Sequence, residues 1–199
     1  TCMAVLCLSS QVNIKDDILF NRQVKVLEND YVSVAVCPQI GARILSFKTI
    51  SDGKETIRVD KANINLNPDD QWYGAEYGGI FNAATNSWPG NAWTYTYKYH
   101  KENTNAIPAL NFIKKITEKK TELSMKVSLL PDSTVMSLEA KQRNLSNEQI
   151  NITNRMHGEF GIGYAADDND FIIYQGKEKL VKIPYRLGWE NPRFSYEQL

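Results

Sequence analysis

The feature that most limits the fold of this chain is an alternation of apolar and polar residues with a period of two. From Leu123 to Leu129, Leu, Met and Val alternate with Ser and Lys. The pattern returns over Met136–Ala140 and over Ile150–Asn154, and the turn-forming sequences PDS and NLSNEQ separate the three segments. Such alternation is typical of antiparallel strands with one buried face. These segments predict a three-stranded meander.

The rest of the chain repeats this pattern, and helix signals are scarce. Tyr31–Val36 places three valines on one face, and Ala42–Ile50 follows it as a second strand candidate before the Asp-Gly turn of SDGK. Shorter strands are expected over Phe171–Tyr174 and Leu180–Ile183, on either side of the turn-like sequence GKEK. Many short strands joined by Gly, Pro, Asn and Asp turns predict an all-β, antiparallel β-sandwich.

The length of 199 residues suits one domain. We expect a single β-sandwich over residues 24–199, either complete or cut short at its C-terminal end. Residues 1–23 form a separate segment that opens with the apolar run TCMAVLCLSS. This run is either the end of an export signal, with Cys2 or Cys7 as a lipid-anchor cysteine, or an edge strand of the domain. The first alternative predicts a periplasmic or lipid-anchored envelope protein, and the second is compatible with the cytoplasm.

Charge and motif content exclude several classes of function. Lys plus Arg and Asp plus Glu both number 23, so the net charge of zero argues against a nucleic-acid partner. No stretch reaches the roughly 18 apolar residues of a membrane-spanning helix. The three cysteines lack Cys-x-x-Cys spacing, the Gly-Ile-Gly sequence lacks a following helix, and DDND lacks the spacing of a calcium loop. We therefore expect no metal and no cofactor.

The stretch Gln71–His100 concentrates the residue types that bind sugars. It holds three of the four Trp, five of the ten Tyr and four of the eleven Gly. Aromatic faces suit the C–H patches of a sugar ring, and amide groups suit its hydroxyls. The candidates are Trp88 and Trp93 for stacking and Asn82 and Asn86 for hydrogen bonds. Alternatively, the tryptophans belong to the core and the asparagines are turn residues.

Three motifs, in this order, resemble the galactose mutarotase-like superfamily of β-supersandwich proteins, which includes the aldose 1-epimerases. The first is PQIGARI between the strands of Val32–Phe47, and the second is the Tyr-Gly-Gly and Trp-Pro loop at Tyr77–Pro89. The third is a strand over Ile150–Met156 that runs into HGEFG. The resemblance covers Val24–Gly163. It implies a concave sheet face that holds a saccharide, and a histidine acid and a carboxylate base that open and reclose the sugar ring.

The resemblance carries over to individual residues only in part. His157 matches a family histidine and is the candidate acid, with Glu159 as an orienting group or base, although a surface glutamate explains Glu159 as well. Arg43 matches the signature arginine and either binds the sugar or packs its stem over the sheet. His100 is a further binding candidate or an exposed strand residue. The expected function is therefore saccharide binding with interconversion of anomers, or a non-catalytic glycan-binding or structural module.

Overall fold

The structure, a computed structural model, describes residues 11–61, 64, 77–82, 92–104, 107–151 and 156–158, together with the backbone of 171–175 and 180–184. Within these ranges the chain forms strands and two short 3-10 turns, η1 (Pro38–Ile40) and η4 (Ala92–Thr94), and it contains no α-helix. No helix in this part of the chain is long and apolar enough to span a membrane.

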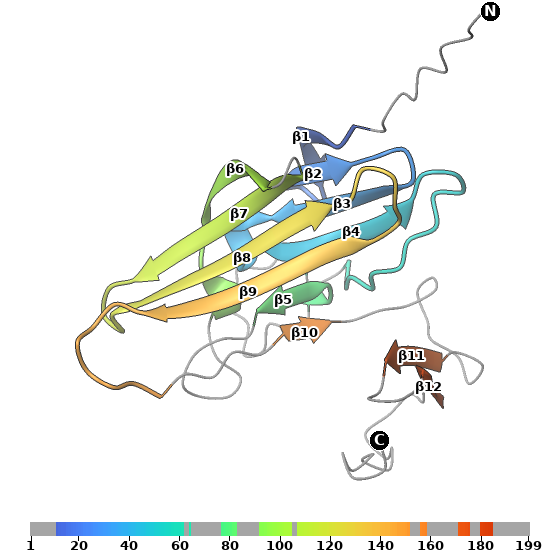
Figure 1. Cartoon of the computed structure of the whole chain (residues 1–199). Coiled ribbons are helices and arrows are strands. Elements are labelled where there is room, and N and C mark those ends of the chain that lie inside the picture. Colours follow the sequence, from blue (N-terminus) through green and yellow to red (C-terminus); the bar gives the residue numbers. More distant parts are fainter. Residues whose placement is uncertain are drawn as a thin grey trace, which may run out of the picture.

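Six antiparallel strands form the larger sheet, in the order β1-β2-β3-β4-β5-β10. The chain runs through its first four strands as successive hairpins and then adds two short strands that are distant in sequence (Figure 1). The strands are β1 (Asn13–Leu19), β2 (Arg22–Glu28), β3 (Val32–Cys37), β4 (Arg43–Thr49), β5 (Ile80–Asn82) and β10 (Met156–Gly158).

Four antiparallel strands form the second sheet, in the order β6-β7-β8-β9. It lies in front of β2, β3 and β4 in Figure 1. A two-stranded hairpin near the C-terminus joins β11 (Phe171–Gln175) to β12 (Leu180–Pro184). The strands of the second sheet are β6 (Lys98–Thr104), β7 (Ile107–Ile116), β8 (Thr121–Leu129) and β9 (Met136–Asn144).

The core lies between the two sheets, which makes the fold the predicted all-β antiparallel sandwich. The apolar positions of β8 are buried while the residues between them are partly exposed. Leu27 and Val34, paired across β2 and β3, are fully buried and belong to the same apolar cluster as Phe112 of β7. Alternation on β8 therefore buries one face of the second sheet against the first.

The expected meander is right for two of its strands, and most of the third lies outside the described residues. Segments 123–129 and 136–140 lie in β8 and β9, but the strand beside β8 on its other side is β7. Ile150 and Asn151 lie in no strand, and residues 152–155 fall outside the described ranges. Strand β7 was missed because Pro108 and the pair Lys114–Lys115 interrupt its alternation, although Leu110, Phe112 and Ile116 are buried.

The remaining strand predictions are confirmed. Strands β3, β4, β11 and β12 form where the alternation or turn pattern indicates them. The stretch Gln71–His100 enters a strand, β6, only at Lys98, after the 3-10 turn of Ala92–Thr94. Within the separate segment 1–23, β1 pairs with β2 over its whole length and is an edge strand; residues 1–10 lie outside the described ranges.

Asn29 makes four hydrogen bonds, two to the turn of the other sheet and two within its own turn between β2 and β3. Its Nδ2 donates to the carbonyl oxygens of Leu130 and Ser133 at 2.7 and 2.8 Å, in the turn between β8 and β9. Its Oδ1 accepts from the backbone N–H groups of Tyr31 and Val32 at 2.9 and 2.8 Å. Only 4% of this residue is exposed. Both the donor and the acceptor of this buried amide have hydrogen-bond partners. They therefore fix the distance between the β2–β3 turn of one sheet and the β8–β9 turn of the other.

Replacing Asn29 with Asp should destabilise the sandwich. The substitution keeps the shape but removes both donors and places a carboxylate oxygen against two carbonyl oxygens. We expect Asn29→Asp to lower the free energy of unfolding at pH 7 by about 3 kcal/mol, measured by denaturant unfolding. Asn147→Asp, at an exposed position in the loop after β9, is the matched control and should change it by less than about 0.5 kcal/mol. Equal losses in the two variants would contradict the role of Asn29.

Candidate functional site

Strands β5 and β10 bring two distant candidate residues onto one face of the six-stranded sheet. His157 lies opposite Phe81 in the β5–β10 register. Ile44 of β4 lies opposite Ile80 of β5, so their neighbours Arg43 and Phe81 share the other face. We call this face the outer face. It is turned away from the four-stranded sheet, because Val34 and Leu27, on the opposite face of the six-stranded sheet, point into the core between the sheets.

Arg43, Phe81 and His157 form a column of three stacked groups across β4, β5 and β10. The guanidinium carbon of Arg43 lies 3.9 Å from the centroid of the Phe81 ring. The imidazole of His157 lies 5.0 Å from the same centroid, with an angle of 31° between the ring planes. His157 is partly exposed, whereas only 2% of Phe81 is. Stacking on a buried ring therefore restrains the imidazole at the surface of the sheet.

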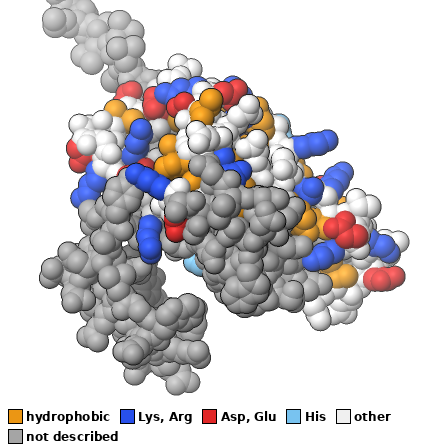
Figure 2. All heavy atoms as spheres, turned by 180° about the vertical axis from the view of Figure 1, so that it is seen from behind, with side chains coloured by type: hydrophobic (Ala, Val, Ile, Leu, Met, Phe, Trp, Pro, Cys, Tyr) orange, Lys and Arg blue, Asp and Glu red, His pale blue; other side chains and the backbone are white. Residues whose placement is uncertain are grey.

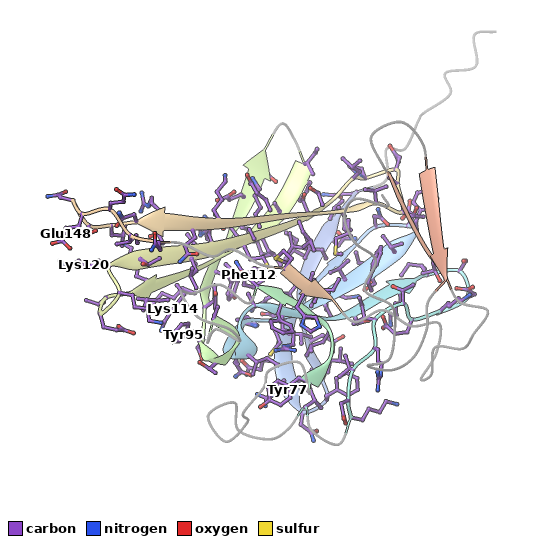
Figure 3. All side chains as sticks on the ribbon, turned by 90° about the horizontal axis from the view of Figure 1, so that it is seen from below. Tyr77, Tyr95, Phe112, Lys114, Lys120 and Glu148 are labelled. Carbon is purple, nitrogen blue, oxygen red and sulfur yellow. The ribbon has the colours of Figure 1, made fainter. Side chains whose placement is uncertain are left out.

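Arg43 is an internal residue. None of its surface is exposed, and its Nη1 donates a hydrogen bond to the carbonyl oxygen of Gly78. The ring of Tyr77, labelled in Figure 3, lies 5.2 Å from its guanidinium carbon. Two roles are expected for Arg43, sugar binding and packing over the sheet, and these contacts match packing. A buried cation needs such partners because the loss of its hydration is costly.

The two glycines before β5 are required by the same packing. Gly78 and Gly79 both have positive φ, +70° and +81°. A Cβ on Gly79 would lie 2.4 Å from the carbonyl oxygen of Ile44 and 3.2 Å from Cγ of Arg43, and a Cβ on Gly78 would lie 2.2 Å from the carbonyl oxygen of Arg58. The Tyr-Gly-Gly motif thus allows the chain to pass closely over β4 and Arg43.

Substitution of Gly79 tests this close approach. Gly79→Ala adds a backbone clash to the cost of a left-handed conformation, so we expect it to lower the free energy of unfolding by about 3 kcal/mol or more. Gly53 is a matched control, because it has a φ of +66° but no atom within 4 Å of an added Cβ. Gly53→Ala should cost only about 1 kcal/mol in the same denaturant titration. Comparable losses would show that backbone conformation alone, and not contact with β4, explains the motif.

The structure does not bring Asn82 or His100 to this column. Asn82 follows Phe81 on β5 and therefore points to the opposite face, where only 2% of it is exposed. Its amide has no hydrogen-bond partner among the described residues. His100 lies on β6 in the other sheet, exposed to solvent. Trp88, Asn86 and Glu159 lie outside the described residues, as does the side chain of Trp93.

His100 belongs instead to a polar network centred on Glu102. Oε1 of Glu102 lies 2.6 Å from Nε2 of His100 and accepts from Nδ2 of Asn111 at 2.8 Å. Its Oε2 lies 3.0 Å from Nζ of Lys126. The hydrogen bond from Asn111 is the main reason that the pKa of Glu102 falls to about 2, and Lys126 and His100 lower it further. These contacts stabilise the charged carboxylate on the exposed face of the second sheet.

The lowered pKa of Glu102 predicts a loss of stability in acid. A carboxyl group whose pKa is lower in the folded state stabilises the fold above its unfolded pKa, ordinarily 4.5 for glutamate, and that contribution is lost as the pH falls toward about 2. We expect Glu102→Gln to remove part of the slope of unfolding free energy against pH in this window. Denaturant titrations at several pH values measure it, and Glu148→Gln, at an exposed carboxylate, serves as the control. A slope unchanged by Glu102→Gln would contradict the network.

Residues not foreseen from the sequence line a shallow groove of about 120 Å³ on the outer face. Val26 and Ala35 form part of its apolar floor, and Ser33, Ser46 and Lys48 supply polar groups. Register places them together, since Val26 and Ser46 both lie opposite Ala35. The polar residues of β3 and β4 alternate with core residues, so the sequence already indicated that polar groups lie on the outer face of these strands. Among the described residues no cluster of His, Cys, Asp and Glu could hold a metal.

The chain is similar in fold to part of a TPR-domain containing protein from Parabacteroides distasonis. The TM-score is 0.50 and the sequence identity 16%, over 60% of this chain and 20% of that chain. At this identity the likeness concerns the fold alone, and it spans about a fifth of the other protein's length. No protein-family model and no curated protein matches the sequence.

Proposed function

We propose that this chain is a saccharide-binding β-sandwich of the mutarotase-like type, and that its ligand lies on the outer face of the six-stranded sheet beside His157. The observation that carries the proposal is the column of Arg43, Phe81 and His157. It presents a restrained, partly exposed imidazole on the same face as the groove. The resemblance of the sequence motifs to mutarotase-like proteins selects a sugar as the ligand.

The chemistry of the groove supports a sugar over an apolar ligand. Its floor of Val26 and Ala35 suits the C–H face of a pyranose. Ser33 and Ser46 carry hydroxyls, and Lys48 carries an ammonium group, so the rim offers both donors and acceptors to the sugar hydroxyls. An apolar floor with a few polar groups that set the orientation is the usual composition of a small-molecule site.

In the proposed reaction His157 donates a proton to the ring oxygen while a base removes the proton from the anomeric hydroxyl. The bond between C1 and the ring oxygen breaks, the open aldehyde rotates, and the reverse proton transfers close the other anomer. Glu55 does not suit the role of base, since its carboxylate accepts from Ser46 Oγ and from the backbone N–H groups of Phe47 and Ile57. Glu159 remains the candidate base.

A second candidate function is a non-catalytic module within a longer polypeptide. It is favoured by one observation, that this fold resembles a fifth of a much longer TPR-domain containing protein. In such a setting the outer face binds a glycan or packs on another domain, and His157 contributes contact area without transferring a proton.

Polarimetry and a binding titration separate these functions. We expect the wild-type chain to accelerate mutarotation of an aldose such as galactose or glucose, and His157→Gln to reduce that acceleration by about 100-fold, because general acid catalysis contributes at least this much. His100→Gln is the matched control, since it removes the only other histidine, which lies on the other sheet, and it should leave the rate unchanged.

Binding is followed by NMR shifts on titration with the same sugars. Binding without any acceleration by the wild-type chain would support the non-catalytic module. If the wild-type chain neither binds nor accelerates mutarotation of any sugar in the panel, the saccharide proposal is wrong.

A further inference from the structure

A second groove lies where the start of β6 meets the end of β7, on the other sheet from His157. Its volume is about 470 Å³. The pairing of Lys98 with Ile113 and of Tyr99 with Phe112 brings the two strands together there. The groove is lined by Thr96, which precedes β6, by three residues of β6 and by three of β7, namely Lys98, Tyr99, His100, Ile113, Lys114 and Lys115. A groove of this size can hold a disaccharide, because ligand sites of about 300–1,000 Å³ take molecules of that class.

Three lysines concentrate positive charge in this groove although the net charge of the whole chain is zero. Neither Lys98 nor Lys114 has a carboxylate partner among the described residues, and Lys115 has only a loose one, with its Nζ 4.0 Å from Glu122. Nζ of Lys114 lies 5.2 Å from the ring centroid of Tyr95, and the two side chains are labelled next to each other in Figure 3. Register places Lys98 and Lys115 on the same face of the sheet and Lys114 on the other, so an anion on that shared face would offset the repulsion between the ammonium groups of Lys98 and Lys115.

The groove also supplies neutral contacts that suit a sugar. Tyr99 is 41% exposed and carries a phenol, Thr96 carries a hydroxyl, and Ile113 offers an apolar surface. His100 is held by Glu102 at 2.6 Å, so its ring is fixed at the rim. Hydroxyl donors and acceptors beside an apolar patch match a pyranose, and the lysines match an acidic substituent on it.

Carboxylates at both sides of the groove argue against a long polyanion. Glu102 lies on β6 itself and Glu122 lies on the neighbouring strand β8, and both form salt bridges with residues of the second sheet. A nucleic acid needs a continuous basic stripe to neutralise successive phosphates, and these carboxylates interrupt one. On the opposite side of the molecule, Figure 2 also shows acidic and basic side chains interspersed among the residues drawn in colour. A compact ligand with one or two negative charges avoids the carboxylates.

We infer that the β6–β7 groove is a binding site for an acidic saccharide, a sugar that carries a carboxylate or sulfate group. This site goes beyond the proposed function, since it lies on the other sheet from His157 and its occupancy does not require mutarotation. Lys98 and Lys115 contact the acidic group, and Ile113, which lies on the same face of the sheet opposite Lys98, contacts the sugar ring.

Isothermal titration of the full chain with a galacturonate disaccharide tests this site, with a neutral galactose disaccharide as the comparison ligand. We expect the acidic sugar to bind at least tenfold more tightly than the neutral one, with an affinity that falls as salt is raised. Lys98→Gln with Lys115→Gln should weaken galacturonate binding by about tenfold or more. Both side chains are exposed, so the double variant should fold normally, which circular dichroism checks.

The matched control is Lys54→Gln with Lys119→Gln, which removes the same charge from two exposed turn positions outside the groove. It should retain wild-type affinity. Equal weakening in both double variants would show that the effect comes from net charge and would overturn the site, as would equal binding of the neutral and acidic disaccharides. Tighter binding of an oligonucleotide than of galacturonate or a sulfated disaccharide would overturn the saccharide assignment. Because His157→Gln should leave galacturonate binding unchanged, failure here is distinguishable from failure of the mutarotase-like proposal.

Discussion

The buried guanidinium of Arg43 is the interaction on which the packing of β4, β5 and β10 depends. A cation without solvent contact needs compensation, and here a carbonyl oxygen of Gly78 and the face of Phe81 supply it. Those contacts are available only because Gly78 and Gly79 let the chain approach β4 closely. Phe81, held in this way, is in turn the surface on which His157 stacks. One buried charge thus determines where an exposed imidazole lies.

The two sheets carry different side chains outside the core that they share. Asn29 sets the separation of their turns, and the apolar positions of β8 fill the space between them. The outer face of the six-stranded sheet has one histidine above a packed aromatic ring. The second sheet carries the Glu102 network and the lysines of the β6–β7 groove. An antiparallel sandwich can hold two such sites, because each sheet has one face that does not contribute to the common core.

Local pattern explains which elements were predictable. Strands β3, β4, β8 and β9 alternate clearly or end at strong turns, and their existence follows from that. Strand β7 was missed because Pro108 and two lysines mask its apolar positions, although the neighbouring β8 supplies the pairing that makes it a strand. The polar groove of the outer face was also readable in principle, since Ser33 alternates with valines. That Ser33 and Ser46 line the same groove was not readable, because it depends on the register of β3 and β4, in which Ser46 lies opposite Ala35.

Sequence alone decided the class of the fold and named both Arg43 and His157, because alternation and turn chemistry are local and motifs are short. Tertiary structure decided what these residues do together. The pairing of β10 with β5 joins segments far apart in the chain, and no local rule predicts it. That pairing puts His157 on Phe81, and the alternation of side chains along β5 sends Asn82 to the opposite face. Since each strand residue points to one side only, a register that unites two candidate residues necessarily separates a third.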